Sequence, residues 1–238
     1  FVFRQIYQTG MGKREKSPKK VKLFSGLMAI PIAIAVIGAV GWLASQSFFP
    51  GNAEKYSTVL VTEDADFATD IPEVNYSEIP FIDKDSAILL GNRTMGTMAD
   101  YVSQFEISDL YSQINYKGQP VRVSPLNYAD FFKWWANKDG GIPAYVIVNM
   151  STQDTEIVRL ENPIRYSDSD PFFYNVDRHV QLSHPFYMFD EKSFEINDDG
   201  EPFWIYPVQK RTIGLFGGTD ITGAALVNAV TGETAYYD

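Results

Sequence analysis

The chain has 238 residues, of which 45% are hydrophobic and 15% aromatic, so its composition is that of a folded protein and not of a disordered tail. It contains no cysteine, which excludes disulfide bonds, thiolate catalysis and zinc sites built on cysteine. Residues 1–22 carry seven basic and one acidic residue, whereas the remainder carries 13 basic and 29 acidic residues. Such an acidic body repels phosphate backbones, so we expect no nucleic-acid partner.

A long uncharged segment, residues 23–53, follows the basic N-terminal residues. A helix needs about 20 apolar residues to cross the hydrocarbon core of a bilayer, and residues 23–43 supply that length. Aromatic residues follow at the far end, where they favour the membrane interface. We therefore predict a transmembrane helix over residues 23–49. A buried soluble helix and a cleavable signal peptide are the alternatives for this pattern.

The basic residues before this segment predict its orientation. The positive-inside rule places them in the cytoplasm, so residues 1–22 are predicted to form a basic cytoplasmic segment and the chain beyond residue 49 to be extracytoplasmic. The expected localisation is a cell membrane crossed once, with the lipid bilayer as a partner. The orienting residues are Lys13, Arg14, Lys16, Lys19, Lys20 and Lys22.

Residues 50–85 are acidic and contain three prolines, which predicts an extended spacer. Its first part, YSTVLVTED, predicts a short strand over residues 56–62.

Residues 86–165 predict a first α+β unit. Its expected elements are a helix capped by Ser86, a hairpin that turns at Lys117 and Gly118, a helix over SPLNYADFFKWWANKDGG capped by Ser124 or Asn127, and a hairpin that turns at residues 152–154.

Residues 166–238 predict a second α+β unit. Its expected elements are a short helix that stops near Pro185, a hairpin that turns at residues 198–200, a connection over QKRTIGLFGGTDITG, and a final hairpin that turns at Thr231 and Gly232.

Two motifs recur in the same order. INYKGQP begins at Ile114 and INDDGEP at Ile196, while VNMSTQDTE begins at Val148 and VNAVTGETA at Val227. Similar turn chemistry in unrelated hairpins would explain the glycines, but it explains less well an ordered pair of motifs with matching strand residues. We therefore predict a duplicated module of helix, hairpin, connection and hairpin, in which two hairpins form a four-stranded antiparallel sheet.

The closing stretch AALVNAVTGETAYYD resembles the end of PepSY-type domains, which are small α+β modules of exported and membrane-bound bacterial proteins. VNMSTQDTEIVRL is a poorer copy, with Gln153 where glycine would stand. The exported part is also similar to uncharacterised membrane-anchored proteins of Gram-positive bacteria. The resemblance implies a protein-binding or regulatory role and brings no catalytic residues. It rests on Val227, Asn228, Ala229, Thr231, Gly232 and Glu233.

The expected fold class is therefore α+β, with one N-terminal transmembrane helix followed by two tandem antiparallel-sheet-plus-helix, PepSY-like units.

No motif predicts catalysis, a metal or a cofactor. His179 and His184 are five residues apart, so they do not share a helical face as zinc ligands spaced by four do. IGLFGGTD lacks the ending of a phosphate loop and predicts a tight connection. The acidic residues at 168–170 do not complete a calcium loop.

We expect a non-enzymatic, membrane-anchored extracytoplasmic protein of a bacterial envelope that binds a protein or peptide partner or scaffolds a membrane complex. Exposed strand edges could also accept an extended peptide. Two alternatives stay open: a subunit of a larger membrane assembly that packs through residues 23–43, and an envelope hydrolase that uses carboxylates and His179. Aromatic residues predict the partner-binding surface: Phe131, Trp134, Trp135, Phe203 and Trp204.

Overall fold

The computed structural model describes residues 18–59, 64–70, 75 and 79–238, and leaves the side chains of residues 18–27 and 67–68 undescribed. The chain divides into two compact units. The first, which we call the helix unit, comprises Phe1–Leu60 and Arg211–Thr219, and the second, the sheet unit, comprises Val61–Lys210 and Asp220–Asp238. The two predicted α+β segments thus fall together in the sheet unit, apart from residues 211–219.

The helix unit is built on α2 (Pro18–Ala44), which carries Pro31 in its interior. In the part of the chain that the structure describes, no helix is long and apolar enough to cross a membrane. The predicted span begins among residues whose side chains are not described, and the helix ends at Ala44 and not at residue 49. Lys19, Lys20 and Lys22 fall in α2 without described side chains, and the remaining orienting residues lie outside the described chain: Lys13, Arg14 and Lys16.

Two short helices occupy part of the predicted spacer, α3 (Asn52–Ser57) and α4 (Phe67–Asp70). α3 replaces the start of the strand predicted at residues 56–62, the remainder of which lies largely outside the described residues. Asn52 fixes this change of direction, because its Nδ2 donates to the carbonyl oxygens of Ala44 (2.7 Å) and Gln46 (3.0 Å). These bonds satisfy carbonyls that the end of a helix leaves unpaired.

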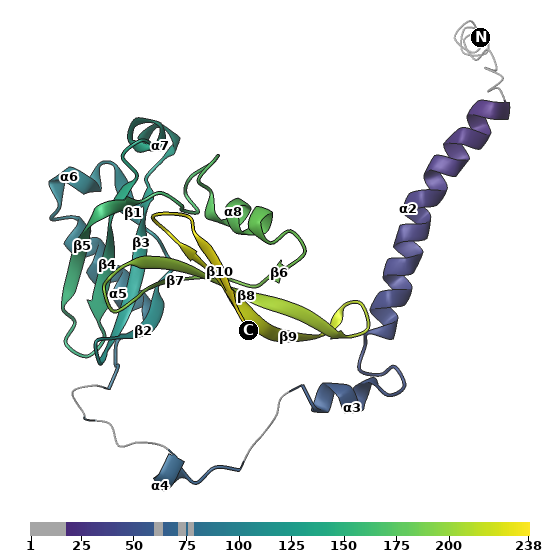
Figure 1. Ribbon diagram of the computed structural model, residues 1–238, viewed down its shortest axis with the longest axis horizontal. Helices are drawn as coiled ribbons and strands as arrows, with labels where there is room; N and C mark the ends of the chain where they lie inside the picture. The colour runs from purple at the N-terminus through teal and green to yellow at the C-terminus, as the bar shows by residue number, and fades with distance from the viewer. Residues whose placement is uncertain (1–17, 60–63, 71–74, 76–78) are drawn as a thin grey trace, which may run out of the picture. The chain divides into compact units, whose positions relative to one another are not determined.

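The first copy of the predicted module has its strands in one antiparallel sheet of order β1-β3-β4-β5, with β2 also paired to β3. Helix α5 packs against β1, β4 and β5 (Figure 1). The elements are α5 (Lys84–Met95), α6 (Ala99–Val102), β1 (Phe105–Ile107), β2 (Ser112–Tyr116), β3 (Gln119–Tyr128), α7 (Phe131–Asn137), β4 (Ile142–Asn149) and β5 (Thr155–Ile164).

Two predicted helix caps in this copy are wrong. The carboxylate of Asp83 accepts from the backbone N–H of Ser86 (2.7 Å), so Asp83 caps α5 and Ser86 is its third residue. Asp130 caps α7 in the same way, because β3 continues through residues 124–128, where the caps Ser124 and Asn127 were predicted. The strand forms there because residues 123–126 and Tyr128 are all buried in the sheet unit.

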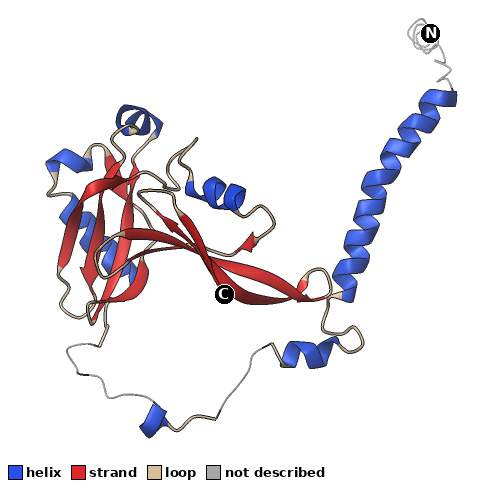
Figure 2. Ribbon diagram, viewed as in Figure 1, coloured by secondary structure: helices blue, strands red, loops and turns tan. Residues whose placement is uncertain are grey.

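The second copy repeats this sheet in the order β10-β9-β8-β6, with β7 also paired to β8 (Figure 2). The predicted connection over residues 209–223 is wrong, because β8 and β9 run through it and leave only residues 214–216 as a turn. The elements are α8 (Val176–Ser183), β6 (Met188–Phe189), β7 (Ser193–Ile196), β8 (Pro202–Ile213), β9 (Gly217–Asn228) and β10 (Thr234–Tyr237).

The two copies match in strand order and in hydrogen bonding. In each, a helix is followed by two short strands that pair with the two halves of one long strand. The N–H of Met150 donates to the oxygen of Pro120 (2.9 Å), and the N–H of Ala229 donates to the oxygen of Pro202 (3.0 Å). The structure therefore shows an α+β fold with two antiparallel sheets of the same topology, as the repeated motifs predict, but each described sheet has five strands and not the predicted four.

The first hairpins of the copies differ by one residue in register. Tyr116 pairs with Gln119 across a two-residue turn. Ile196 pairs with Pro202 across a longer turn in which Gly200 has φ 81°. Relative to its long partner strand, β7 is therefore shifted by one residue from the position of β2.

The two sheets share one core inside the sheet unit. The N–H of Phe194 on β7 donates to Oγ of Ser112 on β2 (3.1 Å), and the rings of Phe194 and Tyr145 lie 6.2 Å apart. The hydroxyl of Tyr145 donates to the carbonyl oxygen of Gly200 (3.0 Å). The copies are thus packed against each other as one body.

Candidate functional site

Helix α7 exposes most of its aromatic residues. It lies between β3 and β4, and four of its seven residues are Phe or Trp. Trp134 is buried, whereas Trp135 is 63% exposed and Phe131 and Phe132 are also exposed. Only one face of this short helix is therefore used for packing.

A second segment, residues 171–174, adds aromatic residues beside α7. The ring of Phe172 lies 5.2 Å from Trp134 and 6.5 Å from Phe131. Phe173 is 91% exposed. We call the exposed residues of both segments the aromatic surface: Phe131, Phe132, Trp135, Phe172, Phe173 and Tyr174.

The buried carboxylate of Asp170 joins the two segments. Its Oδ2 accepts from the indole Nε1 of Trp134 (2.7 Å). Its Oδ1 accepts from the backbone N–H groups of Phe172 (2.8 Å) and Tyr174 (3.2 Å). Hydrogen bonds to a charged group are stronger than neutral ones, so Asp170 holds α7 and residues 171–174 in one arrangement.

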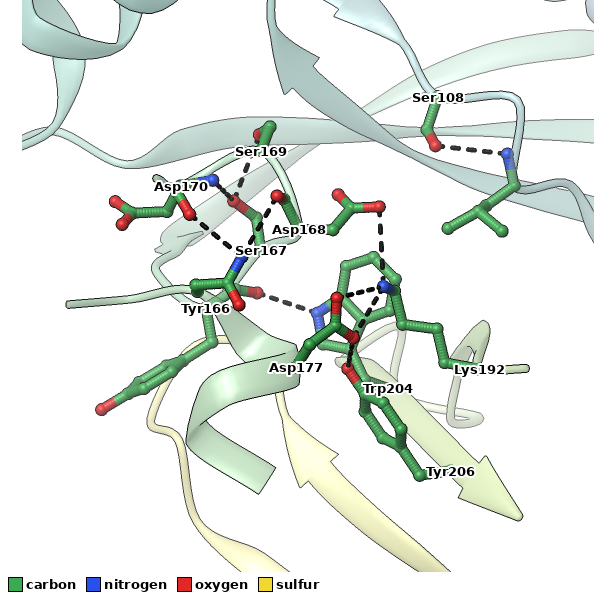
Figure 3. A network of polar contacts seen from close by, with 12 residues as sticks. Ser108, Tyr166, Ser167, Asp168, Ser169, Asp170, Asp177, Lys192, Trp204 and Tyr206 are labelled. Atoms are coloured by element: carbon green, nitrogen blue, oxygen red, sulfur yellow. Dashed lines mark hydrogen bonds and ion pairs between the residues drawn. The ribbon is translucent and has the colours of Figure 1, made fainter. Parts of the chain in front are cut away.

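Residues 166–170, which precede this surface, lie in a polar network (Figure 3). The Nζ of Lys192 lies 2.8 Å from Asp177 and 3.9 Å from Asp168, and the hydroxyl of Tyr206 donates to Asp177 (2.6 Å). Burial raises the pKa of Asp168 more than Lys192 lowers it. Burial and the bond to Asp177 also raise the pKa of Tyr206. This network explains why residues 168–170 are partly buried although they resemble a solvated acidic turn.

The acidic residues do not form a metal site in the described part of the chain, where no cluster of three or more His, Asp or Glu residues is arranged to hold an ion. Asp170 is instead used by Trp134 and the backbone of residues 172–174, and Asp168 by Lys192.

A pocket of about 490 Å³ opens on the aromatic surface. The rings of Trp134, Trp135 and Phe172 line it, together with charged residues of both signs: Lys138, Arg165, Asp139 and Asp170. The ammonium of Lys138 lies 5.4 Å from the centre of the Trp135 ring. The pocket therefore combines aromatic rings with charged groups of both signs.

A larger hollow of about 620 Å³ lies beside β5, which is an edge strand of the first sheet. Charged and polar groups such as Arg159, Glu161 and Asp199 line much of it. Pro163 near the end of β5 lacks an N–H donor, which weakens this edge as a template for another strand. Chemically, the smaller aromatic pocket is the better binding site.

The structure brings together only three of the five residues predicted to bind a partner. Phe131 and Trp135 belong to the aromatic surface, and Trp134 lies beneath it. Trp204 is fully buried on β8, where its Nε1 donates to the oxygen of Tyr166 (2.8 Å), so its predicted role in an exposed surface does not hold. Phe203 is half-buried on the same strand and separate from α7.

The sequence interpretation missed residues 170–174. DPFFY contains a turn signal, Asp before Pro, followed directly by three aromatic residues. The acidic residues at 168–170 resemble part of a calcium loop, whereas the three rings that follow them indicate the exposed aromatic segment. A signal for this half of the surface was therefore present.

His179, the residue proposed for the hydrolase alternative, takes part in packing between elements. Its Nε2 lies 2.7 Å from the carbonyl oxygen of Gly232, and its ring centre lies 4.4 Å from that of Tyr166. These contacts connect α8 to the turn between β9 and β10.

No family model matches the chain, and neither a curated protein sequence nor a solved structure matches it.

Proposed function

We propose that this chain is a non-enzymatic, membrane-anchored extracytoplasmic protein whose two PepSY-like modules present the aromatic surface to a protein partner. The observation that carries the proposal is the exposure of Phe132, Trp135 and Phe173 above a buried hydrogen bond between Trp134 and Asp170.

The chemistry of this surface suits protein recognition. Large rings that stay exposed in a folded chain mark interaction sites more often than single apolar residues do. Trp, Tyr and Arg contribute most of the energy in many protein interfaces, around pockets that lose their water on binding. The partner would place an apolar side chain in the pocket, beside Lys138 and Arg165.

The membrane part of the proposal rests on α2. Its described side chains include many exposed apolar residues, for example Ile34 and Ile37, and the uncharged stretch continues through residues 23–53. Such a helix would be covered by lipid or by helices of a larger membrane assembly, which is the second candidate function. His179 contacts Gly232 and Tyr166, and these contacts do not favour the hydrolase alternative in the way that the exposed apolar residues of α2 favour a membrane protein.

Site-specific photocrosslinking in native membranes tests the aromatic surface. Benzoylphenylalanine would replace Trp135 or Phe173 in the full chain, since both side chains are exposed and their replacement does not disturb the core. The same group in place of Leu182, which is 74% exposed on α8, provides the matched control.

We expect a discrete crosslinked protein from positions 135 and 173 that is absent from position 182 and is competed by the unlabelled chain. The double variant Trp135→Ala/Phe173→Ala should fail to compete, while Leu182→Ala should compete normally. Crosslinks of equal yield at all three positions, or none at 135 and 173, would remove the aromatic surface as the binding site.

A further inference from the structure

The turn between β8 and β9 belongs to the helix unit, where it packs on the end of α2. The N–H of Phe216 donates to Oγ of Ser45 (3.1 Å), which itself donates to the carbonyl oxygen of Gly41 (2.7 Å). The hydroxyl of Tyr56 on α3 donates to the oxygen of Ser45 (2.7 Å). We call residues Arg211–Thr219 the hairpin tip.

Close approach of the backbones makes this contact specific. A Cβ on Gly217 would lie 2.3 Å from the hydroxyl of Tyr56 and 2.6 Å from the oxygen of Ser45. A Cβ on Gly41 would lie 2.7 Å from Cδ1 of Leu215. Glycine is thus required at position 217, where backbone oxygen lies close, whereas at position 41 a larger residue would displace the end of the Leu215 side chain.

The apolar side chains of the hairpin tip stay largely uncovered. Leu215 is 59% exposed and Phe216 51% exposed, although both lie against Gly41. Exposed aromatic residues continue on the neighbouring segment of the helix unit: Trp42, Phe48 and Phe49. The hairpin tip therefore extends the apolar surface of α2 at its C-terminal end, beside which the turn between β8 and β9 lies (Figure 1).

Cationic and hydroxyl groups follow this apolar tip. Arg211 and Thr212 lie near the end of β8, and Thr219 lies near the start of β9 on the other side of the turn. The guanidinium of Arg211 donates to Oγ1 of Thr219. An apolar end followed by cations and hydroxyls fits a lipid interface, where rings and aliphatic groups reach the acyl boundary and cations face phosphate groups.

We propose that the hairpin tip is a second membrane contact, in which Leu215 and Phe216 insert into the outer interface of the bilayer beside the end of α2. The occupant of this apolar surface is lipid, because the surface is continuous with a helix whose large side chains are exposed around its circumference: Ile30, Ile32, Ile34, Val36, Ile37 and Val40. The inference rests on the proposed membrane attachment through α2.

Depth-dependent quenching of single labels tests the insertion. The natural absence of cysteine allows a polarity-sensitive fluorophore to be placed at Val36→Cys, Leu215→Cys or Leu182→Cys in the full chain. Each protein would be reconstituted in vesicles of phosphatidylcholine and phosphatidylglycerol. Aqueous iodide and lipids with a nitroxide near the headgroup or deep in the acyl chain then report the position of each label.

We expect the label at residue 36 to be quenched by the deep nitroxide and that at residue 182 by iodide alone. The label at residue 215 should be quenched by the shallow nitroxide and lose its iodide quenching. If residue 36 lies in lipid but residue 215 behaves like residue 182, the hairpin tip is not inserted while the anchor stands. Protection of residue 215 from both quenchers would indicate a protein partner and overturn lipid as the occupant. If residue 36 also stays in water, the anchor and the insertion fail together.

Two matched substitutions on α2 provide a control for the packing. Gly41→Val places a side chain where Leu215 lies, whereas Gly38→Val, one turn earlier, meets no atom within 4 Å. We expect Gly41→Val to restore iodide quenching at residue 215 and Gly38→Val to leave it protected. Equal protection in both variants would show that contact with α2 does not position the hairpin tip.

Discussion

The two copies differ most in the connection between β3 and β4 in the first copy and between β8 and β9 in the second. In the first copy, β3 ends at Tyr128 and the chain forms α7 before β4 begins at Ile142. In the second copy, β8 continues to Ile213 and only residues 214–216 separate it from β9. The same place in the module thus carries an exposed aromatic helix in one copy and a long hairpin in the other.

This difference shows how a duplicated sheet can acquire two roles. The strand order and the bonds from Met150 to Pro120 and from Ala229 to Pro202 are alike. Apart from the register of the first hairpins, the largest variation lies in a connection between strands. We propose that α7 serves a partner and that the hairpin tip serves the membrane, so each copy would use the same position for a different contact.

The largest expected effect comes from Trp204→Ala. By the Pro120–Pro202 match, the position of Trp204 corresponds to that of Arg122, which is only half-buried. Trp204 is fully buried, packs edge-on against Phe194 at 5.1 Å and donates to the oxygen of Tyr166. We expect the free energy of unfolding to fall by about 3–5 kcal/mol in Trp204→Ala, as measured by urea denaturation.

Arg122→Ala is the counterpart in the first copy, and we expect a loss of less than about 1 kcal/mol because its interactions are near the surface. Similar losses in both variants would mean that the two sheets distribute their core equally, contrary to the burial described here.

A change in stability of intermediate size is expected from the turns of the last hairpin in each copy. Gln153 has φ 68° and Gly232 has φ 77° in turns with equivalent hydrogen bonds. A Cβ on Gly232 would also lie 2.3 Å from the ring of Tyr166. We therefore expect Gly232→Gln to lower the free energy of unfolding by about 2–4 kcal/mol, from positive φ and overpacking together.

The reciprocal variant Gln153→Gly relieves the positive φ but makes the unfolded chain more flexible, so its effect should stay within about 1 kcal/mol. Thermal unfolding of both variants checks the comparison. A destabilisation by Gln153→Gly as large as that by Gly232→Gln would contradict the different surroundings of the two turns.

The smallest expected effect concerns the caps of α5 and α8. Asp83 caps the first helix and Asn175 the second, where Oδ1 accepts from the N–H of Arg178 (3.0 Å). The bonds from Ser86 lower the pKa of Asp83. Its contribution to stability is therefore present above the unfolded pKa, which is about 3.9, and is lost as the pH falls through the lower folded pKa.

The variant Asp83→Asn gives the first copy a cap that does not titrate. We expect its stability at neutral pH to be nearly that of the parent chain and its loss of stability in acid to be smaller. Thermal unfolding measured as a function of pH provides the comparison. An unchanged acid profile in Asp83→Asn would mean that the cap of α5 does not contribute to it.

The sequence predicts the positions of the turns in this fold better than the positions at which its strands end. Glycine at positions 118, 200 and 232 has positive φ, so turn chemistry locates these hairpins correctly. The continuation of β8 and β9 through residues 209–223 was not predicted, because the glycines there indicate a loop. Gly214 and Gly217 instead allow close contact with Ser45, which is 169 and 172 residues away from them in the sequence.

For the aromatic residues too, the sequence predicts the local element but not the burial of each side chain. The pattern identifies α7 as an aromatic helix but not which rings are covered, since Trp134 is buried by Asp170 and Phe172 from a distant segment. Trp204 lies on β8, where buried and half-buried residues alternate, and its side chain is covered by a segment distant in the sequence, to whose Tyr166 oxygen it donates. Long-range partners of this kind leave no local signal.

The one-residue offset between the first hairpins also means that their loops are not interchangeable parts. Ile114–Pro120 and Ile196–Pro202 have the same number of residues, so the offset comes from the pairing and not from an insertion. A slip of β7 into the register of β2 would bring Glu195 across from Trp204 in place of Phe194. Since side chains alternate between the faces of a strand, such a slip would direct a carboxylate into the shared interior, and the longer turn at residues 198–200 keeps Phe194 there instead.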